Sequence, residues 1–501
     1  MFEKDKEAYY EPLFNRDITH KVVILKLLYN KIDGVNIEQL IAATGLDRRT
    51  IYKYINQLND FSLKVYNKEA IVYSPNNNYR FLGNKLDLQN LKVAIIESTP
   101  IYALVKLFLS NKTVNLHTFC VENYIGESTF KRQIRKVNQL LKYVKASISI
   151  RKGELVILGD EATIRYCFIT FLWRTYRGLD WPFDLIPQEK IDGLVNFISS
   201  RTGVSISTGK RQQLAYIFAV NIARANIKLE PIENNIPSYS SILIELSPFY
   251  KPFKGYLEEN FSLGSSEIKF IFNFLQTFPD FSMARKNNQE FLHSIKGLSH
   301  PVYSSISQFI NFVRKQHPEF GLETSQGNTF VGLLIASHIF IDTFTNCYFN
   351  ISDINLTAYA MDKFPHLIPT IYDFICKTSH HLELNARKTL AVRYAQAYVM
   401  VFPPQDFEPE INIYLDTDVP VYVERILMRS IRSVLNPLYN CKLTTASNED
   451  KIDLVLSTLD FNDRFSKTPQ LFINAELSEK DAKYILAECR KIILEKEKDR
   501  K

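Results

Sequence analysis

Positively charged side chains are the groups in this chain whose number and spacing indicate a chemical role. The 501 residues carry a formal net charge of +7. The first 160 residues hold 24 Lys and Arg against 16 Asp and Glu, so the whole excess is N-terminal. Residues 111–152 alone hold nine basic and two acidic residues. Such a cluster can bind a polyanion such as nucleic acid, and the alternative is a solvated, charged helix face.

Residue patterns typical of enzymes are absent from the sequence. No two glycines are separated by a single residue, which excludes the dinucleotide-binding fingerprint, and neither HExxH nor GxSxG occurs. The six cysteines are widely spaced and form no CxxC pair. The histidines show no spacing typical of a metal site. We therefore expect no enzymatic activity, no cofactor and no bound metal.

An internal repeat lies within the basic region. Residues 36–58 align with residues 115–137 at an offset of 79. Asn36, Thr50 and Ile55 meet identical residues in the second copy, and the apolar positions also coincide. Each copy is predicted to form a short helix, a turn and a second helix whose apolar residues recur at i, i+4 and i+7. This is the helix-turn-helix arrangement.

Turns and hairpins complete the two predicted units. Each turn contains a glycine, Gly45 or Gly126. Each copy is followed by a predicted β-hairpin, within residues 63–83 and 148–159. The second hairpin turns at Arg151-Lys152-Gly153-Glu154, which gives it a cationic tip. We expect this tip to lie over phosphates or an adjacent minor groove, although a surface hairpin that is merely basic is the alternative.

The outward face of the second helix in each copy supplies the candidate binding residues. In the first copy they are Arg48, Arg49, Tyr52 and Lys53. In the second copy they are Ser128, Thr129, Lys131, Arg132 and Arg135, joined by Arg151 and Lys152 of the hairpin tip. Arg and Lys can donate to guanine acceptors or phosphates, and hydroxyl groups can anchor the backbone. The alternative is two ordinary helical hairpins with solvated basic faces.

The rest of the chain is predicted to contain several further domains, because 501 residues are too many for one. Residues 161–400 show helical periods rich in aromatic residues, and their length suits two all-α bundles joined near residues 285–300. Residues 402–410 contain three prolines and three acidic residues, which indicates a linker.

A small α/β domain around a largely parallel sheet is predicted for the C-terminal segment. The predicted strands are 411–415, 441–446, 453–458 and 470–474. Two amphipathic helices are predicted, over residues 421–435 and 478–496. The residues that we expect the first helix to bury are Val423, Ile426, Leu427, Ser430, Ile431 and Val434. Those of the second helix are Ala482, Ile485, Leu486, Cys489, Ile492 and Ile493.

The segment after the second hairpin resembles a known family. It reads LVILGDEATIRYCFITFLW (155–173) and contains Gly159, Glu161, Ile164 and Arg165 in a G-x-E-x-x-I-R pattern. Together with the duplicated helix-turn-helix, this pattern resembles the Mga family of transcription regulators from Gram-positive bacteria. The resemblance implies a mainly α, multidomain fold. Its parts are two winged helix-turn-helix units (1–84 and 85–160), two all-α regulatory domains of the phosphotransferase-system type, or PRDs (161–287 and 288–402), and a small α/β domain similar to enzyme IIB (410–501).

The same resemblance implies a function. It implies binding to promoter duplex DNA, activation of virulence or carbohydrate-linked genes, and a homodimer formed through the C-terminal domain. It also implies histidine phosphorylation by phosphocarrier proteins of the phosphotransferase system. The first regulatory domain contains no histidine. We therefore expect phosphorylation on His338, with His300 as the second choice.

One more departure from the family pattern and two alternatives remain. The loop at residues 416–420 lacks the reactive cysteine of enzyme IIB, so we expect a domain that assembles subunits without transferring phosphate. No apolar stretch approaches the roughly 20 residues of a membrane helix, so we expect a cytoplasmic protein with no membrane partner. The alternatives are an RNA-binding antiterminator with similar regulatory domains, which the duplicated helix-turn-helix disfavours, and a phosphotransferase component.

Overall fold

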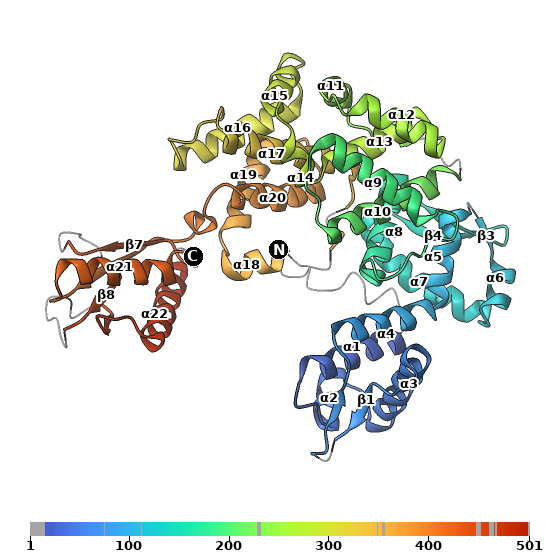
Figure 1. Ribbon diagram of the computed structural model, residues 1–501, viewed down its shortest axis with the longest axis horizontal. Helices are drawn as coiled ribbons and strands as arrows, with labels where there is room; N and C mark the ends of the chain where they lie inside the picture. The colour runs from blue at the N-terminus through green and yellow to red at the C-terminus, as the bar shows by residue number, and fades with distance from the viewer. Residues whose placement is uncertain are drawn as a thin grey trace. The chain divides into compact units, whose positions relative to one another are not determined.

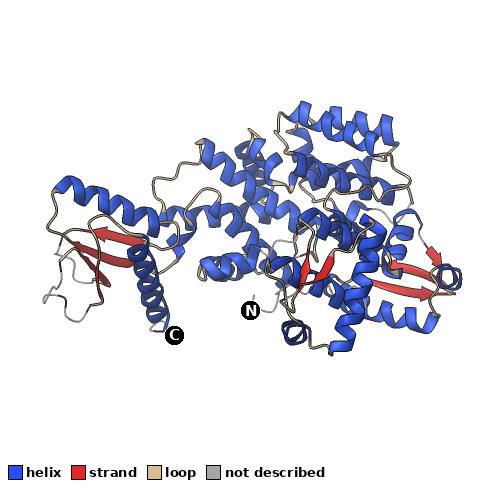
Figure 2. Cartoon of the chain, turned by 60° about the horizontal axis from the view of Figure 1, so that its bottom comes forward, coloured by secondary structure: helices blue, strands red, loops and turns tan. Residues whose placement is uncertain are grey.

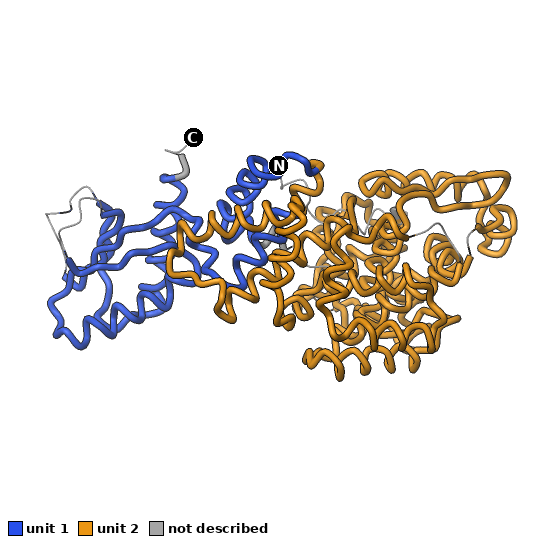
Figure 3. Tube along the Cα trace, turned by 90° about the horizontal axis from the view of Figure 1, so that it is seen from above, with its two compact units in different colours: residues 1–3, 355–382, 390–501 blue, residues 4–354, 383–389 orange. Residues whose placement is uncertain are grey.

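The computed structural model divides the chain into two compact units (Figure 3). The large unit comprises residues 4–354 and 383–389, and the C-terminal unit consists mainly of residues 355–382 and 390–501. The division falls inside residues 288–402, which the sequence assigns to a single domain. The residues that the structure describes are 16–74, 76–111, 113–227, 232–347, 349–352, 356–446, 452–459, 465 and 468–498.

Residues 16–84, called module 1, form a small helical body with one hairpin (Figure 1). Its elements are α1 (Arg16–Asn30), α2 (Ile37–Thr44), α3 (Arg48–Tyr66), β1 (Ile71–Tyr73) and β2 (Tyr79–Phe81). The two strands pair antiparallel. Helix α1 packs against α2 and α3 and covers the side chains that the helical spacing turns inward. The residues at the centre of this core are Ile24, Leu25, Leu40, Ile51 and Leu58.

Residues 85–160, called module 2, repeat this pattern with one additional α-helix, a short 3-10 helix and one additional strand. The elements are α4 (Lys85–Glu97), α5 (Pro100–Ser110), β3 (Thr113–Asn115), α6 (Leu116–Glu122), α7 (Glu127–Leu141), the short 3-10 helix η3 (Lys142–Val144), β4 (Ser147–Arg151) and β5 (Glu154–Leu158). Strand β3, which the sequence did not predict, pairs with β5 to give the order β3-β5-β4. Helix α4 also packs against α1 and α3, so it joins the two modules.

The remainder of the large unit is entirely helical within the described residues (Figure 2). Its helices are α8 (Glu161–Tyr176), α9 (Gln188–Thr202), α10 (Thr208–Ala225), η4 (Ile232–Asn235), α11 (Ser240–Glu245), α12 (Tyr250–Phe261), α13 (Ser265–Gln276), α14 (Pro279–Ala284), α15 (Asn288–Gly297), α16 (Pro301–Gln316) and α17 (Ser325–Thr343). Helix α8 packs against α10 and α4, and α13 packs against α17. The predicted helical character of this region is confirmed.

The C-terminal unit contains a four-stranded parallel sheet. Its elements are α18 (Leu356–Lys363), α19 (Leu367–Thr378), most of α20 (Leu384–Val399), η5 (Pro404–Phe407), β6 (Ile411–Asp416), α21 (Val421–Leu435), β7 (Cys441–Thr444), β8 (Leu454–Ser457), β9 (Gln470–Phe472) and α22 (Glu479–Lys498). The strand order is β7-β6-β8-β9, and every pair is parallel. The predicted small parallel sheet is therefore confirmed.

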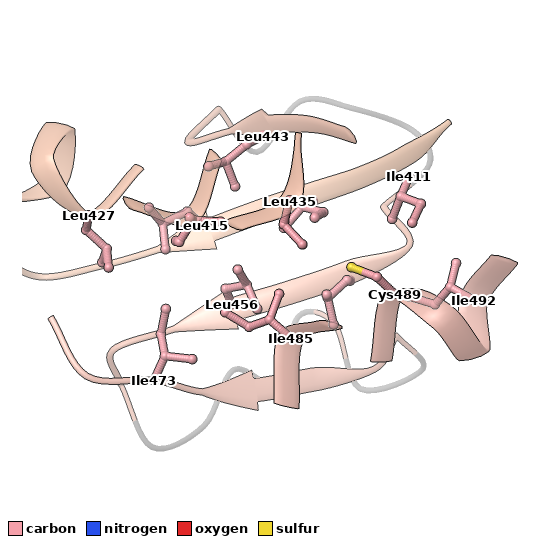
Figure 4. Close-up of a cluster of buried hydrophobic side chains, with 13 residues drawn as sticks. Ile411, Leu415, Leu427, Leu435, Leu443, Leu456, Ile473, Ile485, Cys489 and Ile492 are labelled. Carbon is pink, nitrogen blue, oxygen red and sulfur yellow. The ribbon is translucent and has the colours of Figure 1, made fainter. Parts of the chain in front are cut away.

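Helices α21 and α22 cover this sheet with apolar side chains (Figure 4). Ile485, Cys489 and Ile492 of α22 are buried as predicted. The prediction for Ile426 is wrong, because its side chain is 60% exposed. Leu427 and Ile431 are buried as predicted, and Leu435, which was not predicted, completes the buried stripe of α21. Ile426 lies one residue from this stripe, which is about 100° around the helix axis.

One further segment differs from its sequence interpretation. The proline-rich segment 402–410 is packed, not exposed, since Phe407 is buried and its ring lies 4.8 Å from that of Tyr398. Among the described residues, no single helix has the length and hydropathy to cross a membrane. Helices α4 and α5 satisfy that test only as a pair, and they meet at a bend of 78°.

Candidate nucleic-acid interface

The two helix pairs begin in the same way. Asn36 precedes α2, and its side chain accepts a hydrogen bond from the backbone N–H of Gln39 at 2.8 Å. Asn115 precedes α6 and accepts from the N–H of Thr118 at 3.0 Å. Both asparagines satisfy an N–H group that has no partner within its helix. The identity at this position of the repeat is therefore a shared N-cap.

The turns of the two pairs differ in a way that the sequence did not reveal. Gly45 ends α2 with φ of 68°, in the left-handed region. The residue 79 positions later is Tyr124, with φ of 50°. Gly126 lies directly before the first residue of α7 and has φ of −69°. Gly126 is thus the counterpart of Asp47, not of Gly45. Asp47 accepts from the O–H and N–H of Thr50 at 2.6 and 2.9 Å, and these bonds lower the pKa of Asp47.

An asparagine near the middle of the second helix fixes each hairpin. The side chain of Asn59 donates to the carbonyl of Ile71 at 2.8 Å and accepts from its N–H at 2.9 Å. Asn138 makes the same two bonds with Ile148, at 2.8 and 2.7 Å. These residues occupy equivalent positions, one beyond the aligned segments. Extending the alignment by one residue would have found them.

The candidate cations of module 1 lie on the exposed side of α3. Arg48, Arg49 and Lys53 are all exposed. Nη2 of Arg48 lies 2.6 Å from Oε1 of Glu38, so this guanidinium already has a counter-charge. Arg49 and Lys53 make no ion pair within the described residues. Two of the three cations are therefore available to a polyanion.

Three tyrosines connect α3 to the module 1 hairpin. Tyr52 is 40% exposed, and its ring centroid lies 6.3 Å from that of Tyr79 in β2. The ring centroid of Tyr79 lies 5.0 Å from that of Tyr73 in β1, and Tyr73 is 60% exposed. The sequence indicated only Tyr52 of this group. The others could not be recognised without the strand pairing that places Tyr73 opposite Tyr79.

Most of the candidate residues on α7 of module 2 are exposed to solvent. Ser128, Thr129, Arg132 and Arg135 are exposed, and neither arginine has an ion-pair partner in the part of the chain that the structure describes. Lys131 is half-buried, and its Nζ lies 3.0 Å from Oε2 of Glu127.

Further cations of module 2 surround these residues. Lys131 and His117 hold the pKa of Glu127 below its usual value. Lys136 and Lys142 are also exposed, although the sequence did not single them out.

The tip of the module 2 hairpin carries two further exposed cations, Arg151 and Lys152. In the strand register, Arg151 of β4 lies opposite Glu154 of β5 across the turn. Lys152 and Gly153 occupy the two central positions with φ of 52° and 82°. A two-residue turn with two left-handed residues matches the twist of the strands that it joins. The predicted hairpin therefore exists, and its tip projects two positive charges.

The two candidate histidines have different environments. His338 is 2% exposed within α17, which is buried along most of its length. His300 is half-buried at the N-terminus of α16. Its Nδ1 accepts from the N–H of Val302 at 3.3 Å, and its Nε2 lies 3.1 Å from the Ser238 hydroxyl. Burial lowers the pKa of His300. His300 is therefore the more accessible of the two.

The remaining candidate sites are a metal centre and the loop after β6. Within the described residues, no group of three His, Cys, Asp or Glu side chains could hold a metal ion. The loop after β6, at residues 416–420, is hydrogen-bonded to the residue that follows β8. The Thr458 hydroxyl lies 3.1 Å from Oδ1 of Asp418 and 3.2 Å from the Thr417 hydroxyl.

A known family matches module 2 and the start of the helix that follows it. Residues 84–172 match the family model of the Mga helix-turn-helix domain. This stretch contains module 2 and most of α8. The resemblance to Mga-type regulators that the sequence indicated is thereby confirmed.

Two relatives from Bacillus anthracis are named for their roles. The chain is 19% identical over 215 residues to the capsule synthesis positive regulator AcpB. It is 21% identical over 215 residues to the capsule synthesis positive regulator AcpA. Each alignment covers 42% of this chain and 42% of the relative. The chain thus matches less than half the length of these regulators.

Proposed function

We propose that this chain is a DNA-binding transcription regulator of the Mga type that binds promoter duplex through modules 1 and 2. The observation that carries the proposal is the exposed face of α7, where Arg132 and Arg135 have no counter-charge among the described residues. This face lies within the segment that matches the Mga helix-turn-helix domain. Unpaired cations on a second helix of this kind suit the phosphates and guanine edges of the major groove.

The two elements of module 2 would contact different parts of the duplex. Arg132 and Arg135 on α7 would lie in or beside the major groove, where a guanidinium can donate two bonds to guanine. Arg151 and Lys152 at the hairpin tip would lie over neighbouring phosphates and add affinity without sequence choice. Because Asn138 bonds α7 to β4, the helix and the hairpin are held in one body.

The proposed organisation assigns regulation to the rest of the chain. Two PRD-like domains (161–287 and 288–402) and an enzyme IIB-like domain (410–501) would set activity and oligomerisation in the cytoplasm. The helical character of the first region and the parallel sheet of the last support this assignment. The names of AcpA and AcpB favour activation of virulence-linked genes.

DNA binding is tested by fluorescence anisotropy over a salt series. Duplexes would first be selected from sheared genomic DNA with the whole chain. Arg132→Ala/Arg135→Ala is expected to weaken binding and to lower the log-log salt slope by up to about 1.8, the value for two phosphate contacts at about 0.9 each. The control is Lys190→Ala/Lys251→Ala, which removes two exposed lysines from α9 and α12. An equal slope change in both variants, or preference for hairpin RNA over duplex DNA, would contradict the proposal.

Phosphorylation by a phosphocarrier protein is proposed for His300 before His338, because His338 is only 2% exposed. Incubation with labelled phosphoenolpyruvate and the phosphotransferase proteins is expected to label the wild-type chain. His300→Ala should lose most of the label and His338→Ala should retain it. The reverse pattern would show that α17 opens to expose His338.

A homodimer is proposed to form through α21. Val421, Tyr422 and Ile426 are 66%, 69% and 60% exposed, which leaves an apolar surface on this helix. Tyr422→Glu/Ile426→Glu is expected to convert a dimer to a monomer in light scattering. The matched control is Leu185→Glu/Leu298→Glu, which changes two exposed leucines of the large unit. A wild-type monomer would refute this part of the proposal.

A further inference from the structure

Buried ion pairs join α8, the helix that directly follows module 2, to α10 and α13. Glu161, the first residue of α8, accepts two bonds from Arg224 of α10, at 2.9 Å from Nε and 2.7 Å from Nη2. It also accepts from Nε of Arg165 at 2.9 Å. Arg165 in turn makes a bidentate pair with Glu267 of α13, at 2.5 and 2.9 Å. The side chains of Arg165 and Arg224 are only 1% and 2% exposed.

Arg224 makes one more bond, to the backbone of module 2. Its Nη1 donates to the carbonyl oxygen of Phe108 at 2.6 Å. Phe108 lies in the last turn of α5, just before β3 begins at Thr113. Glu161 follows β5, which ends at Leu158. One guanidinium therefore holds both the segment that leads into residues 113–158 and the segment that leads out of them.

Residues 113–158, called the distal part of module 2, carry every candidate binding residue of that module. Both segments that join the distal part to the rest of the chain are tied to α10 by Arg224. With both segments fixed, the distal part has little freedom to rotate relative to α10. With either segment released, it could pivot about the other.

Stability alone does not explain this arrangement. Removing two charges from water costs several kcal/mol per ion, so a buried pair is often no more stabilising than apolar side chains of similar size. What a charged pair adds is direction, because a guanidinium offers five donors in a fixed plane. Here that plane aligns a carboxylate of α8 and a carbonyl of α5 with α10.

We propose that Arg224 and Glu161 are positioning residues that hold the distal part of module 2 in one orientation on α10. The inference rests on the proposed DNA binding of α7. Fixing the orientation of α7 keeps both modules in register for one duplex, which raises the effective concentration of the second module once the first is bound. Arg165 and Glu267 extend the clamp to α13, so a change in the packing of α10 or α13 would reorient α7.

Pulsed electron paramagnetic resonance on the full chain tests the clamp directly. Spin labels would be attached through noncanonical residues at Tyr124, which is 98% exposed in the distal part, and at Lys190 on α9. Helix α9 packs against α10 and so reports on the helical region. The wild-type chain should give one narrow distance distribution. Arg224→Met should broaden it at least about twofold and weaken duplex binding about tenfold.

Matched variants distinguish positioning from loss of stability. Arg174→Met removes another buried arginine, whose Nη2 donates to the carbonyl of Asn350 at 2.7 Å, away from residues 113–158. It should lower the melting temperature without broadening the distance distribution. Arg224→Lys keeps a positive charge at this position, so it should unfold less readily than Arg224→Met. Its distance distribution should have a width between those of the wild type and Arg224→Met. An unchanged distribution in both Arg224 variants, or equal broadening in Arg174→Met, would overturn the proposal.

The two proposals fail in different ways. If the wild-type chain binds no duplex, the proposed function fails, while the distance measurement still reports whether Arg224 holds the distal part. If the wild-type chain binds duplex and the distance distribution does not respond to Arg224→Met or Arg224→Lys, only the clamp is refuted.

Discussion

Modules 1 and 2 share their buried polar contacts and differ in their exposed charges. Both begin the first helix of the pair with a capping asparagine, and both fix the hairpin through an asparagine of the second helix. Their surfaces do not correspond in this way. In module 1 a carboxylate, Asp47, precedes α3, and Glu38 neutralises Arg48. In module 2 a glycine, Gly126, precedes α7, and the hairpin tip adds two exposed cations, Arg151 and Lys152. Each second helix has two candidate cations without an ion pair among the described residues.

The difference teaches that scaffold and surface vary independently in this repeat. The apolar and asparagine positions are constrained because each makes specific buried contacts. The outward positions of α3 and α7 have no such constraint, so module 1 can offer tyrosines beside its cations while module 2 carries a cationic hairpin tip. We infer that module 2 supplies most of the electrostatic affinity for DNA and that module 1 adds contacts less sensitive to salt.

The largest expected effect compares the cations of the two second helices. One variant replaces Lys131, Arg132 and Arg135 with Ala, and the matched variant replaces Arg48, Arg49 and Lys53. The first is expected to lower the log-log salt slope by up to about 2.7, at about 0.9 per phosphate contact. Each set has one cation that is already paired, Arg48 or Lys131. The second variant should still change the slope less, because the exposed cations Lys136, Lys142, Arg151 and Lys152 accompany α7 in module 2. Anisotropy titrations measure both slopes, and equal values would remove the proposed division between the modules.

A smaller effect is expected from the two hairpin-fixing asparagines. Asn59→Ala or Asn138→Ala leaves a strand N–H and C=O without their partners, which costs about 1–3 kcal/mol of local stability. The loss should be larger at Asn59, which is buried, than at half-buried Asn138, where water can replace the side chain. Hydrogen exchange at the amides of Ile71 and Ile148 measures it. A larger increase in exchange at Ile148 in Asn138→Ala than at Ile71 in Asn59→Ala would contradict this order.

Much of this scaffold could be predicted from the sequence. The repeat offset, the apolar spacing of α3 and α7, and the Lys-Gly turn all depend on local residue patterns, which the structure follows. The strands of the C-terminal sheet were predictable for the same reason. The role of Gly126 was not, because glycine suits both a left-handed turn and an extended position before a helix.

Long-range contacts account for most of what the sequence could not reveal. Strand β3 is three residues long and is defined by its pairing with β5, about 40 residues later. The bond from Arg224 to the carbonyl of Phe108 joins residues 116 positions apart. The burial of His338 was similarly hidden, since a histidine in an apolar helix is compatible with either a core or a surface position.

The two hairpins allow a finer comparison. Tyr73→Ala removes an exposed ring from the module 1 hairpin, which should weaken duplex binding by about 0.5–1.5 kcal/mol, the range of an aromatic contact. The salt slope should not change, because no charge is lost. Arg151→Ala in the module 2 hairpin should instead lower the slope by about 0.9. Anisotropy at several salt concentrations separates the two, and a slope change in Tyr73→Ala would argue against a neutral contact.

The smallest expected effect has the opposite sign. Glu38→Gln removes the counter-charge of Arg48, so affinity for duplex DNA should rise about twofold, while the loss of an exposed ion pair costs less than about 1 kcal/mol. Glu127→Gln is the matched change in module 2, where it releases Lys131. Its gain should be offset in part, because Glu127 lies in the first turn of α7, where a carboxylate is stabilised by the helix dipole. Tighter binding by Glu38→Gln alone would show that the Glu38 carboxylate weakens a contact between Arg48 and the duplex. Unchanged affinity would place Arg48 outside the interface.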